Sequence, residues 1–385
     1  MERRLLAGHA WIYKNEVERS PTHAEAGDLV DVLDARGQFL GRGYLNPRST
    51  ILIRLLDRSP VPIDRSFFIE RFRRARSWRQ RMFQARPPDA RSNPYRLVHG
   101  ESDGLPGLIV DRYGDAVCLQ ILTAGMERHR DSILGALDEV IQPTSIVVRN
   151  DSPMREREGL NRERLVLRGA PQTPVQMNGL KVGVDLLEGQ KTGLFLDQSD
   201  NYRLLQGLVT GAEVLDCFCY LGLWGLHAAQ YGASQVIGVD QASLAIAHAV
   251  ELANENGYGD RCQFQTRNVF DDLNERDRRQ ETFDLVILDP PAFVKNRGRL
   301  TEAIRGYKEI NLRAMRLLRE GGFLVTCSCS HHLSAESFRE LLLDAAGDVG
   351  RAIKLVSRTG QSADHPILLG MPETEYLKCF VLQIM

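Results

Sequence analysis

The 385-residue sequence lacks the features that mark membrane, secreted and disulfide-stabilised proteins. No stretch approaches the roughly 20 apolar residues of a membrane-spanning helix. The first residues include two arginines, but they are not followed by the apolar core or small-residue cleavage site of a signal peptide. The seven cysteines include no C-x-x-C pair, which argues against a disulfide scaffold and favours a reducing compartment. We therefore expect a cytoplasmic protein with no membrane partner.

A net charge of −1 does not by itself indicate a nucleic-acid partner, but the arginines are unevenly distributed. Residues 54–96 contain twelve arginines and four acidic residues. Guanidinium groups suit phosphate, so we expect the helix predicted over residues 67–83 to contact RNA. The candidate RNA contacts are Arg71, Arg74 and Arg81. The alternative is a solvated amphipathic helix that buries Phe72, Trp78 and Phe83.

The pattern of predicted secondary structure changes twice along the chain, and we divide the chain into three regions. Residues 1–70 contain short strands separated by glycine turns, which predicts a small β-barrel. Residues 71–185 begin with the arginine-rich helix and continue as an α+β pattern. In residues 186–385 apolar strands alternate with helices, which predicts an α/β fold with a parallel, doubly wound sheet. Such sheets bind ligands at the carboxyl ends of their strands.

The first three strands of the last region end in residues suited to a nucleoside cofactor. The first runs into D-C-F-C-Y-L-G, where Gly222 allows a ligand to approach the backbone and the amides of the next helix favour an anion. Asp216 in this turn is suited to a cationic amino group. Asp240, at the end of the second strand, is suited to ribose hydroxyls. Asn268, after the third strand, is suited to an adenine amino group.

Two alternatives apply to this pocket. A nicotinamide enzyme would share Asp240 but would carry G-x-G-x-x-G on the first turn, where this chain has Gly222 and then Trp224-Gly225. Either acid alone could be a buried strand-end residue with a structural role. Because Asp216 and Asp240 stand at consecutive strand ends, adenosylmethionine fits this pattern best.

The fourth and fifth strands end in groups suited to chemistry on a nucleobase. The turn D-P-P-A-F is stiffened by its prolines, so that Asp289 can face an amine-bearing base and Phe293 can stack on it. Taken alone, this turn indicates methylation of an exocyclic amine. The fifth strand ends in T-C-S-C-S-H-H and includes Cys329. A thiolate that adds to carbon 6 of cytosine makes carbon 5 nucleophilic enough to accept a methyl group. We therefore favour cytosine carbon 5 as the target.

Other interpretations of the fifth strand end remain open. A strand cysteine is more often a buried, inert residue than a nucleophile. A metal site built from the C-x-C pairs and the two histidines lacks the usual zinc spacing, so we expect no metal. His331 and His332 could act as general bases, although packing or helix capping is the commoner role.

Several phrases along essentially the whole chain resemble one known family. They are G-H-A-W-I (8–12), G-Y-L-N-P-R-S (43–49), G-E-S-D-G-L-P-G-L-I-V-D-R-Y (100–113), R-E-R-E-G (155–159), K-T-G-L-F-L-D-Q (191–198), D-P-P-A-F (289–293), S-C-S (328–330), and D-H-P through P-E-T-E-Y-L-K (364–378). As a set, they resemble the RlmI-type bacterial 23S ribosomal RNA cytosine-carbon-5 methyltransferases.

The resemblance implies a PUA domain over residues 1–70, a central α+β domain over 71–185 and a Rossmann-like class I methyltransferase domain over 186–385. It implies S-adenosylmethionine as cofactor, 23S ribosomal RNA as substrate and a homodimer. The family's nucleophile falls on Cys329, beside Asp289 and Phe293. Cys327, on the same face of the strand, is the second candidate. The implied cofactor contacts are Gln198, Asp216, Phe218, Tyr220, Gly222, Asp240, Asn268 and Asp289.

Three positions depart from the family pattern. Ser199 replaces a frequent arginine, which removes any anion contact from that position. Asn268 replaces a common aspartate, and its amide can still accept a hydrogen bond. The D-P-P-A turn carries no second cysteine, so the base that removes the carbon-5 proton is unassigned. Two other functions remain possible: methylation of a guanine nitrogen, which needs no covalent cysteine, and a non-catalytic RNA-binding assembly factor.

Overall fold

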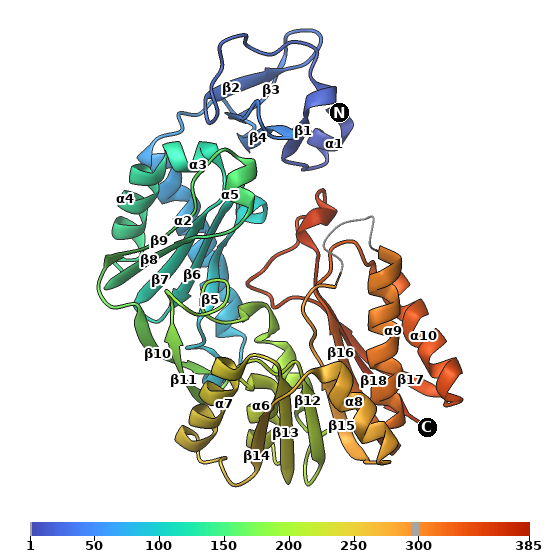
Figure 1. The fold of residues 1–385 in the computed structure, drawn as a ribbon. Coiled ribbons are helices and arrows are strands. Elements are labelled where there is room, and N and C mark those ends of the chain that lie inside the picture. The colour runs from blue at the N-terminus through green and yellow to red at the C-terminus, as the bar shows by residue number, and fades with distance from the viewer. Residues whose placement is uncertain (1, 294–299) are drawn as a thin grey trace. The chain divides into compact units, whose positions relative to one another are not determined.

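The computed structural model describes residues 2–293 and 300–385 (Figure 1). The chain forms two compact units, each completed by a short segment from late in the sequence. The first contains residues 1–196 and 363–374, and the second contains residues 197–362 and 375–385. In the described residues no helix is long and apolar enough to span a membrane.

The first unit begins with a four-stranded antiparallel sheet in the order β1-β4-β3-β2. Its elements are α1 (Glu2–Leu6), β1 (Trp11–Tyr13), β2 (Leu29–Leu33), β3 (Phe39–Leu45) and β4 (Ile51–Asp57). Ile12, Leu45 and Ile53 are among the buried residues of its core. Gly43 allows β3 and β4 to approach closely, since a Cβ there would lie 2.2 Å from the carbonyl oxygen of Arg54.

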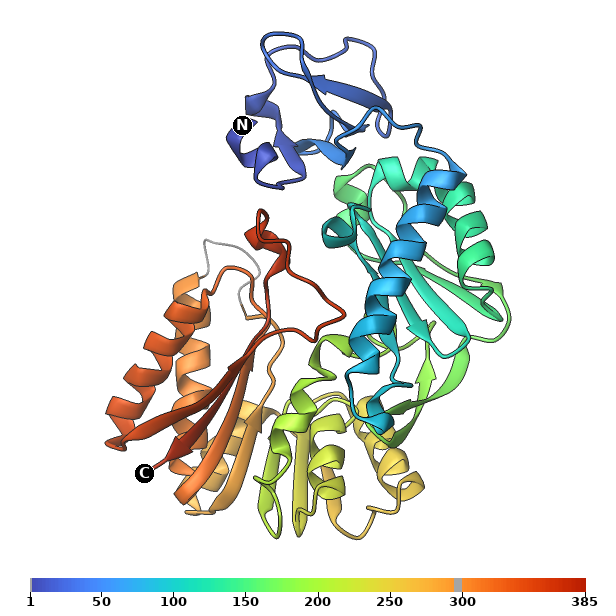
Figure 2. The ribbon, with the colours of Figure 1, turned by 180° about the vertical axis from the view of Figure 1, so that it is seen from behind.

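The rest of this unit is a five-stranded sheet in the order β5-β6-β7-β8-β9, with a separate β10–β11 hairpin. Helix α2 packs on this sheet and contacts α4 (Figure 2). Asp64 caps α2 by accepting hydrogen bonds from the backbone amides of Ser66 and Phe67. The elements are α2 (Arg65–Gln84), β5 (Tyr95–His99), β6 (Leu108–Tyr113), β7 (Ala116–Ile121), α3 (Ala124–Arg128), α4 (Arg130–Val140), β8 (Ser145–Asn150), α5 (Met154–Arg157), β9 (Glu163–Arg168), β10 (Gln172–Met177) and β11 (Leu180–Asp185).

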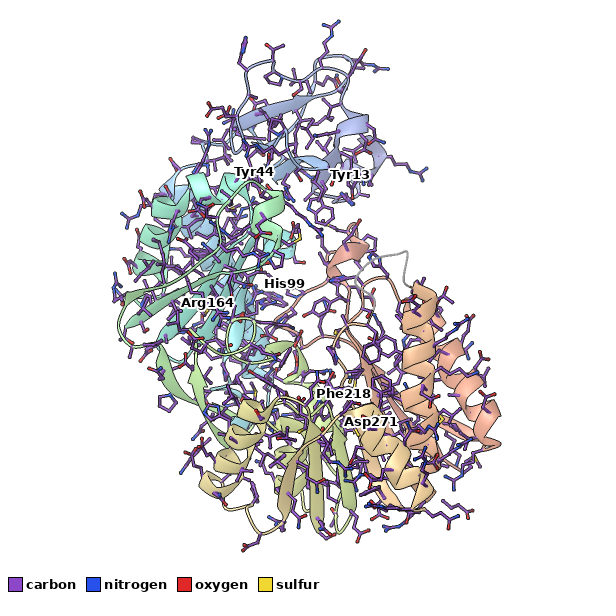
Figure 3. The ribbon with its side chains drawn as sticks, viewed as in Figure 1. Tyr13, Tyr44, His99, Arg164, Phe218 and Asp271 are labelled. Carbon is purple, nitrogen blue, oxygen red and sulfur yellow. The ribbon has the colours of Figure 1, made fainter. Side chains whose placement is uncertain are left out.

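Buried polar contacts join the two sheets of the first unit. The hydroxyl of Tyr44, labelled in Figure 3, donates to the carbonyl oxygen of Pro106 at 2.7 Å. Arg54 and Glu158 form an ion pair at 2.9 Å, and their side chains are only 5% and 2% exposed. Asn46 donates a further hydrogen bond to the Glu158 carboxylate at 2.6 Å. The phrases G-Y-L-N-P-R-S and R-E-R-E-G, far apart in the sequence, therefore meet in the fold.

The second unit contains a seven-stranded sheet in the order β14-β13-β12-β15-β16-β18-β17. The five strands β12 to β16 are parallel, and β18 is antiparallel to both of its neighbours. The elements are β12 (Glu213–Cys217), α6 (Leu223–Gln230), β13 (Gln235–Asp240), α7 (Ser243–Glu255), β14 (Cys262–Thr266), α8 (Val269–Arg278), β15 (Phe283–Leu288), α9 (Leu300–Arg316), β16 (Leu318–Ser328), α10 (Ala335–Val349), β17 (Ile353–Thr359) and β18 (Lys378–Ile384).

The predicted parallel sheet is confirmed for β12 to β16, but the sheet as a whole is mixed. The antiparallel β17–β18 pair was not predicted, because strand direction depends on pairing with distant segments. Helix α2 begins at Arg65, so it spans the proposed boundary at residue 70. The division into residues 1–70, 71–185 and 186–385 stays a prediction.

The buried Arg54–Glu158 pair gives a test of how the first unit is held together. Changing Glu158 to alanine should lower the free energy of unfolding by about 3–5 kcal/mol, because it leaves a buried guanidinium without its counter-charge. The matched control is Asp138→Ala, which breaks the exposed Arg168–Asp138 pair and should have a much smaller effect. Urea denaturation of both variants measures the difference, and equal reductions in stability would contradict the assigned role.

Candidate active site

The turn after β12 has an unusual backbone. Phe218, Tyr220 and Gly222 all have positive φ angles, of 60°, 48° and 72°. Left-handed backbone suits glycine, whereas a side chain there costs of order 1–3 kcal/mol and tends to occur at functional sites. The Phe218 ring lies 6.3 Å from the rings of both Phe270 and Phe293. The strained turn therefore directs an aromatic side chain toward the ends of neighbouring strands.

Asp216 fixes the helix that follows this turn. Its Oδ2 accepts a hydrogen bond from the Gly225 amide at 2.9 Å, which serves as a cap because the N-cap residue Gly222 has no side chain. Within the described part of the chain, the buried Oδ1 has no hydrogen-bond partner. Burial raises the pKa of Asp216 well above its ordinary value. A cationic group that approached Oδ1 would stabilise the carboxylate.

Asp240 is held at the end of β13 by two backbone amides. Oδ2 accepts from Tyr220 at 3.0 Å and Oδ1 from Ala242 at 2.9 Å. A carboxylate has further lone pairs, so it can still accept hydrogen bonds from two hydroxyls of a ligand. The hydrogen bond with Tyr220 also links Asp240 to the strained turn.

Asn268 occupies the N-cap of α8, where its oxygen accepts from the amides of Phe270 and Asp271 at 2.9 and 3.3 Å. The oxygen expected to accept an adenine amine is thus already used by the helix. The amide NH2 group is the better placed part of this side chain to bind a ligand. Phe218 and Asp271 are labelled in Figure 3, and the ring of Phe270, next to Asp271 in the chain, lies 6.3 Å from that of Phe218.

Asp289 is oriented by two side chains from other segments. Its Oδ2 accepts from Gln198 Nε2 and from the Trp224 indole nitrogen, both at 3.0 Å. The Gln198 side chain is itself fixed, because its oxygen accepts from Asn201 at 2.7 Å. The last residue of K-T-G-L-F-L-D-Q therefore contacts the D-P-P-A-F turn and helps to fix the orientation of its carboxylate.

Cys329 lies beside this turn. Strands β15 and β16 are parallel neighbours, and Cys329 Sγ lies 3.9 Å from the carbonyl oxygen of Pro290. All seven cysteines lie in the described residues, and Cys329 is the one that is partly exposed. Cys327 is buried opposite Cys379 on β18, and burial raises its pKa well above the ordinary value. Accessibility favours Cys329 over Cys327 as a nucleophile, and burial disfavours ionisation of Cys327.

Phe293 joins an aromatic cluster instead of standing alone as a stacking surface. Its ring lies 4.6 Å from Tyr307 on α9 and 5.9 Å from Phe270. The Tyr307 hydroxyl is hydrogen-bonded to Ser330 at 3.0 Å, next to Cys329. The cluster thus connects the D-P-P-A-F turn with the end of β16.

Comparison with known proteins identifies this arrangement. Residues 162–368 match the model of the S-adenosylmethionine-dependent methyltransferases, and residues 1–58 match that of a PUA-like domain. The chain belongs to the S-adenosylmethionine-dependent methyltransferase family. A relative from Alteromonas mediterranea is 38% identical over 387 residues, which cover 100% of this chain and 96% of the relative. One from Escherichia coli O139:H28 is 37% identical and covers 100% and 97%. Both are named ribosomal RNA large subunit methyltransferase I.

Solved structures show the same fold. A Streptococcus mutans protein described as an S-adenosylmethionine-dependent methyltransferase superposes with a TM-score of 0.84 at 22% identity, covering 99% of this chain and 97% of that one. A methyltransferase structure in complex with S-adenosylhomocysteine gives the same values. A tRNA m1G37 methyltransferase of M. jannaschii has a TM-score of 0.51 at 18% identity, covering 72% and 76%. The predicted PUA-like and Rossmann-like folds are confirmed.

S-adenosylmethionine fits the residues at the ends of β12, β13 and β14. The buried, unpartnered Oδ1 of Asp216 is suited to a cationic amino group, and the fixed carboxylate of Asp240 is suited to ribose hydroxyls. No group of three or more potential metal ligands occurs among the described residues.

The arginine-rich helix α2 divides its side chains between the core and the surface. Arg71 forms an ion pair with Asp57 at 2.7 Å, and burial lowers its pKa. Arg79 is 0% exposed and pairs with Asp103 at 2.8 Å. Arg74 is 67% exposed, and Arg81 is also exposed. The phenylalanines of the amphipathic alternative, Phe72 and Phe83, are indeed buried. Of the three candidates, Arg74 and Arg81 are exposed and Arg71 is partly buried.

The sequence interpretation missed three polar residues of this region. At the sequence level, Trp224 was treated only as a departure from a glycine motif. A buried indole nitrogen needs a hydrogen-bond acceptor, and this requirement could have indicated a polar partner nearby. Tyr307 and Lys378 gave no local signal, because their partners lie 23 and 48 residues away in the sequence. His331 and His332, considered as bases, are exposed.

Proposed function

We propose that this methyltransferase forms 5-methylcytosine in large-subunit (23S) ribosomal RNA through a covalent adduct with Cys329. The relatives that match the whole chain carry names that specify large-subunit ribosomal RNA. The observation that carries the proposed chemistry is the partly exposed thiol of Cys329 beside the turn that contains Asp289. Ribosomal RNA as substrate is in keeping with the expected cytoplasmic location.

The residues at the two strand ends would divide the chemistry between them. Bound S-adenosylmethionine supplies an electrophilic methyl group. The Cys329 thiolate would add to carbon 6, so that the electron pair of the ring's 5,6 double bond becomes available at carbon 5. Asp289, oriented by Gln198 and Trp224, would accept a hydrogen bond from the amino group that marks cytosine and, when it carries a proton, donate that proton to the ring nitrogen, which becomes basic as the thiolate adds. Loss of the carbon-5 proton then re-forms the double bond and expels the thiolate.

The implied cofactor contacts beyond the two strand-end acids form part of the same proposal. Gln198 would act through Asp289, while Phe218 and Tyr220 would shape the turn that approaches the cofactor. Asn268 would bind adenine through its NH2 group, because its oxygen caps α8. Phe293, held in the aromatic cluster by Tyr307, would form one side of the site that receives the cytosine base.

Methylation of a guanine nitrogen is the second candidate. The tRNA m1G37 methyltransferase shares the fold, and a D-P-P turn suits an amine-bearing base. Such a reaction gives no role to Cys329, because a ring nitrogen needs no covalent activation. A non-catalytic assembly factor would likewise have no need for an accessible thiol at the strand end. Methylation of cytosine carbon 5 gives a role both to the D-P-P turn and to the accessible thiol of Cys329.

The first unit would bind the RNA substrate. Its PUA-like domain and the exposed Arg74 and Arg81 of α2 would offer phosphate contacts. Arg71 and Arg74 each pair with an acidic residue, but Arg71 would contribute less because its pair with Asp57 is much less exposed than the pair of Arg74 with Glu70. The homodimer implied by the resemblance stays a prediction.

A 23S RNA fragment that carries 5-fluorocytosine at the target position tests the covalent mechanism. Fluorine at carbon 5 cannot leave as a proton does, so the protein should form an adduct that survives SDS electrophoresis when S-adenosylmethionine is present. Cys329→Ala should form no adduct and should lose methyl transfer while it still binds S-adenosylhomocysteine in calorimetry.

The matched control is Cys327→Ser, which changes the buried cysteine two positions earlier and should retain the adduct. Adduct formation by Cys329→Ala, or methylation of normal RNA without any adduct on the fluorinated RNA, would overturn the mechanism.

Exchange of Arg74 and Arg81 for glutamine tests the RNA surface of α2. The double variant should bind RNA more weakly, and the slope of log K against log salt should fall by about 0.7–0.9 for each phosphate that is no longer neutralised. The control double variant, Arg278→Gln with Arg339→Gln, removes two exposed arginines from α8 and α10. Equal slopes in the two double variants would show that α2 has no special role.

A further inference from the structure

Lysine is rare in this chain, and one lysine is buried beside the proposed nucleophile. The sequence contains seven lysines and 42 arginines. Lys378 is only 6% exposed and closes the phrase P-E-T-E-Y-L-K, to which the proposed mechanism gives no role. Arginine keeps its proton under all ordinary conditions, whereas a buried lysine can share one. A lysine at this position in an arginine-rich chain therefore suggests a role for a titratable amine.

The fold places this amine at the end of β16. Lys378 is the first residue of β18 and pairs with Ser328, the last residue of β16. Its Nζ donates to the carbonyl oxygen of Ser330 at 2.6 Å and to that of Tyr376 at 2.8 Å. Cys329 stands in the chain between Ser328 and Ser330, so Lys378 is bound to the residues on both sides of it.

Burial and nearby negative charge have opposite effects on Lys378. Burial lowers its pKa to about 8, while negative charge on Cys329 and on Glu375 acts in the opposite direction. Of these two, Cys329 has the larger effect on Lys378. Other titratable groups of the described residues near this strand end include Asp289, Tyr307, His331, Tyr376, Cys327 and Cys379.

We infer that Lys378 is a positioning residue that holds Cys329 as a thiolate by placing a buried cationic amine at the end of β16. This inference rests on the proposed role of Cys329 as nucleophile. The Sγ–H bond breaks with release of its proton to solvent, and the ammonium of Lys378 stabilises the thiolate that remains. The two carbonyl oxygens orient the ammonium. When the thiolate is expelled at the end of turnover, the same ammonium receives it as a counter-ion.

The rate of alkylation by iodoacetamide as a function of pH tests this pairing without RNA or cofactor. Alkylation follows the thiolate, and Cys329→Ser gives the background from the six buried cysteines. In Lys378→Met the midpoint for Cys329 should rise by about one pH unit, so that the rate at pH 7 falls about tenfold. Lys378→Arg, which keeps a cation, should stay close to the native midpoint.

The matched control is Lys354→Met, which removes an exposed lysine from the neighbouring strand β17 and should leave the profile unchanged. A native midpoint in a folded Lys378→Met protein would overturn the inference. A shift of equal size in Lys378→Arg would also overturn it, because a merely structural role would then explain both.

The reciprocal measurement does not depend on the folding of Lys378→Met. In protein labelled with 13Cε-lysine, the Lys378 midpoint should move to lower pH in Cys329→Ser, because the thiolate that favours the ammonium is gone. An unchanged midpoint contradicts the pairing. Failure of the 5-fluorocytosine adduct together with a normal lysine effect would refute the proposed function alone, whereas an adduct without the lysine effect would refute the pairing alone.

Discussion

The carboxylate of Asp289 accepts hydrogen bonds from Gln198 and Trp224, and the arrangement of the site depends on this interaction. Gln198 belongs to the segment before β12, Trp224 to α6 and Asp289 to the turn after β15, so one oxygen joins three separate segments. The same turn touches Cys329 through the carbonyl oxygen of Pro290. A carboxylate held in one orientation beside a thiol suits a reaction on a pyrimidine. The carboxylate can bind the ring while the thiol adds to the same ring.

On the cofactor side of the site, carboxylates likewise hold separate segments in place. Asp216 and Asp240 each use their carboxylate to fix backbone, the first at α6 and the second at the strained turn that contains Tyr220. The two residues proposed to bind the cofactor thus also hold the scaffold, which couples precise placement to stability. This dual use explains why buried acids can be retained although burial raises the pKa of Asp216.

The alternation of strands and helices was enough to predict the parallel part of the sheet and to place Asp216, Asp240 and Asp289 at or near the ends of its strands. It could not distinguish Cys329 from Cys327, because both lie on one face of β16. The difference comes from β18, which places Cys379 against Cys327, and such long-range antiparallel pairing has no local signal. Likewise, the composition showed that the predicted helix is rich in arginine, but it could not show which arginines are buried. Arg79 is buried and Arg74 is exposed because of the way α2 packs on the sheet.

The central claim is that this chain places a methyl group on carbon 5 of a cytosine in large-subunit ribosomal RNA by means of Cys329. Bisulphite sequencing of that RNA tests it most directly, in cells that lack the gene and in the same cells complemented with the native protein or with Cys329→Ala. We expect one cytosine that resists conversion with the native protein and is converted in the other two strains. Identical protection in all strains, or protection restored by Cys329→Ala, would contradict the claim.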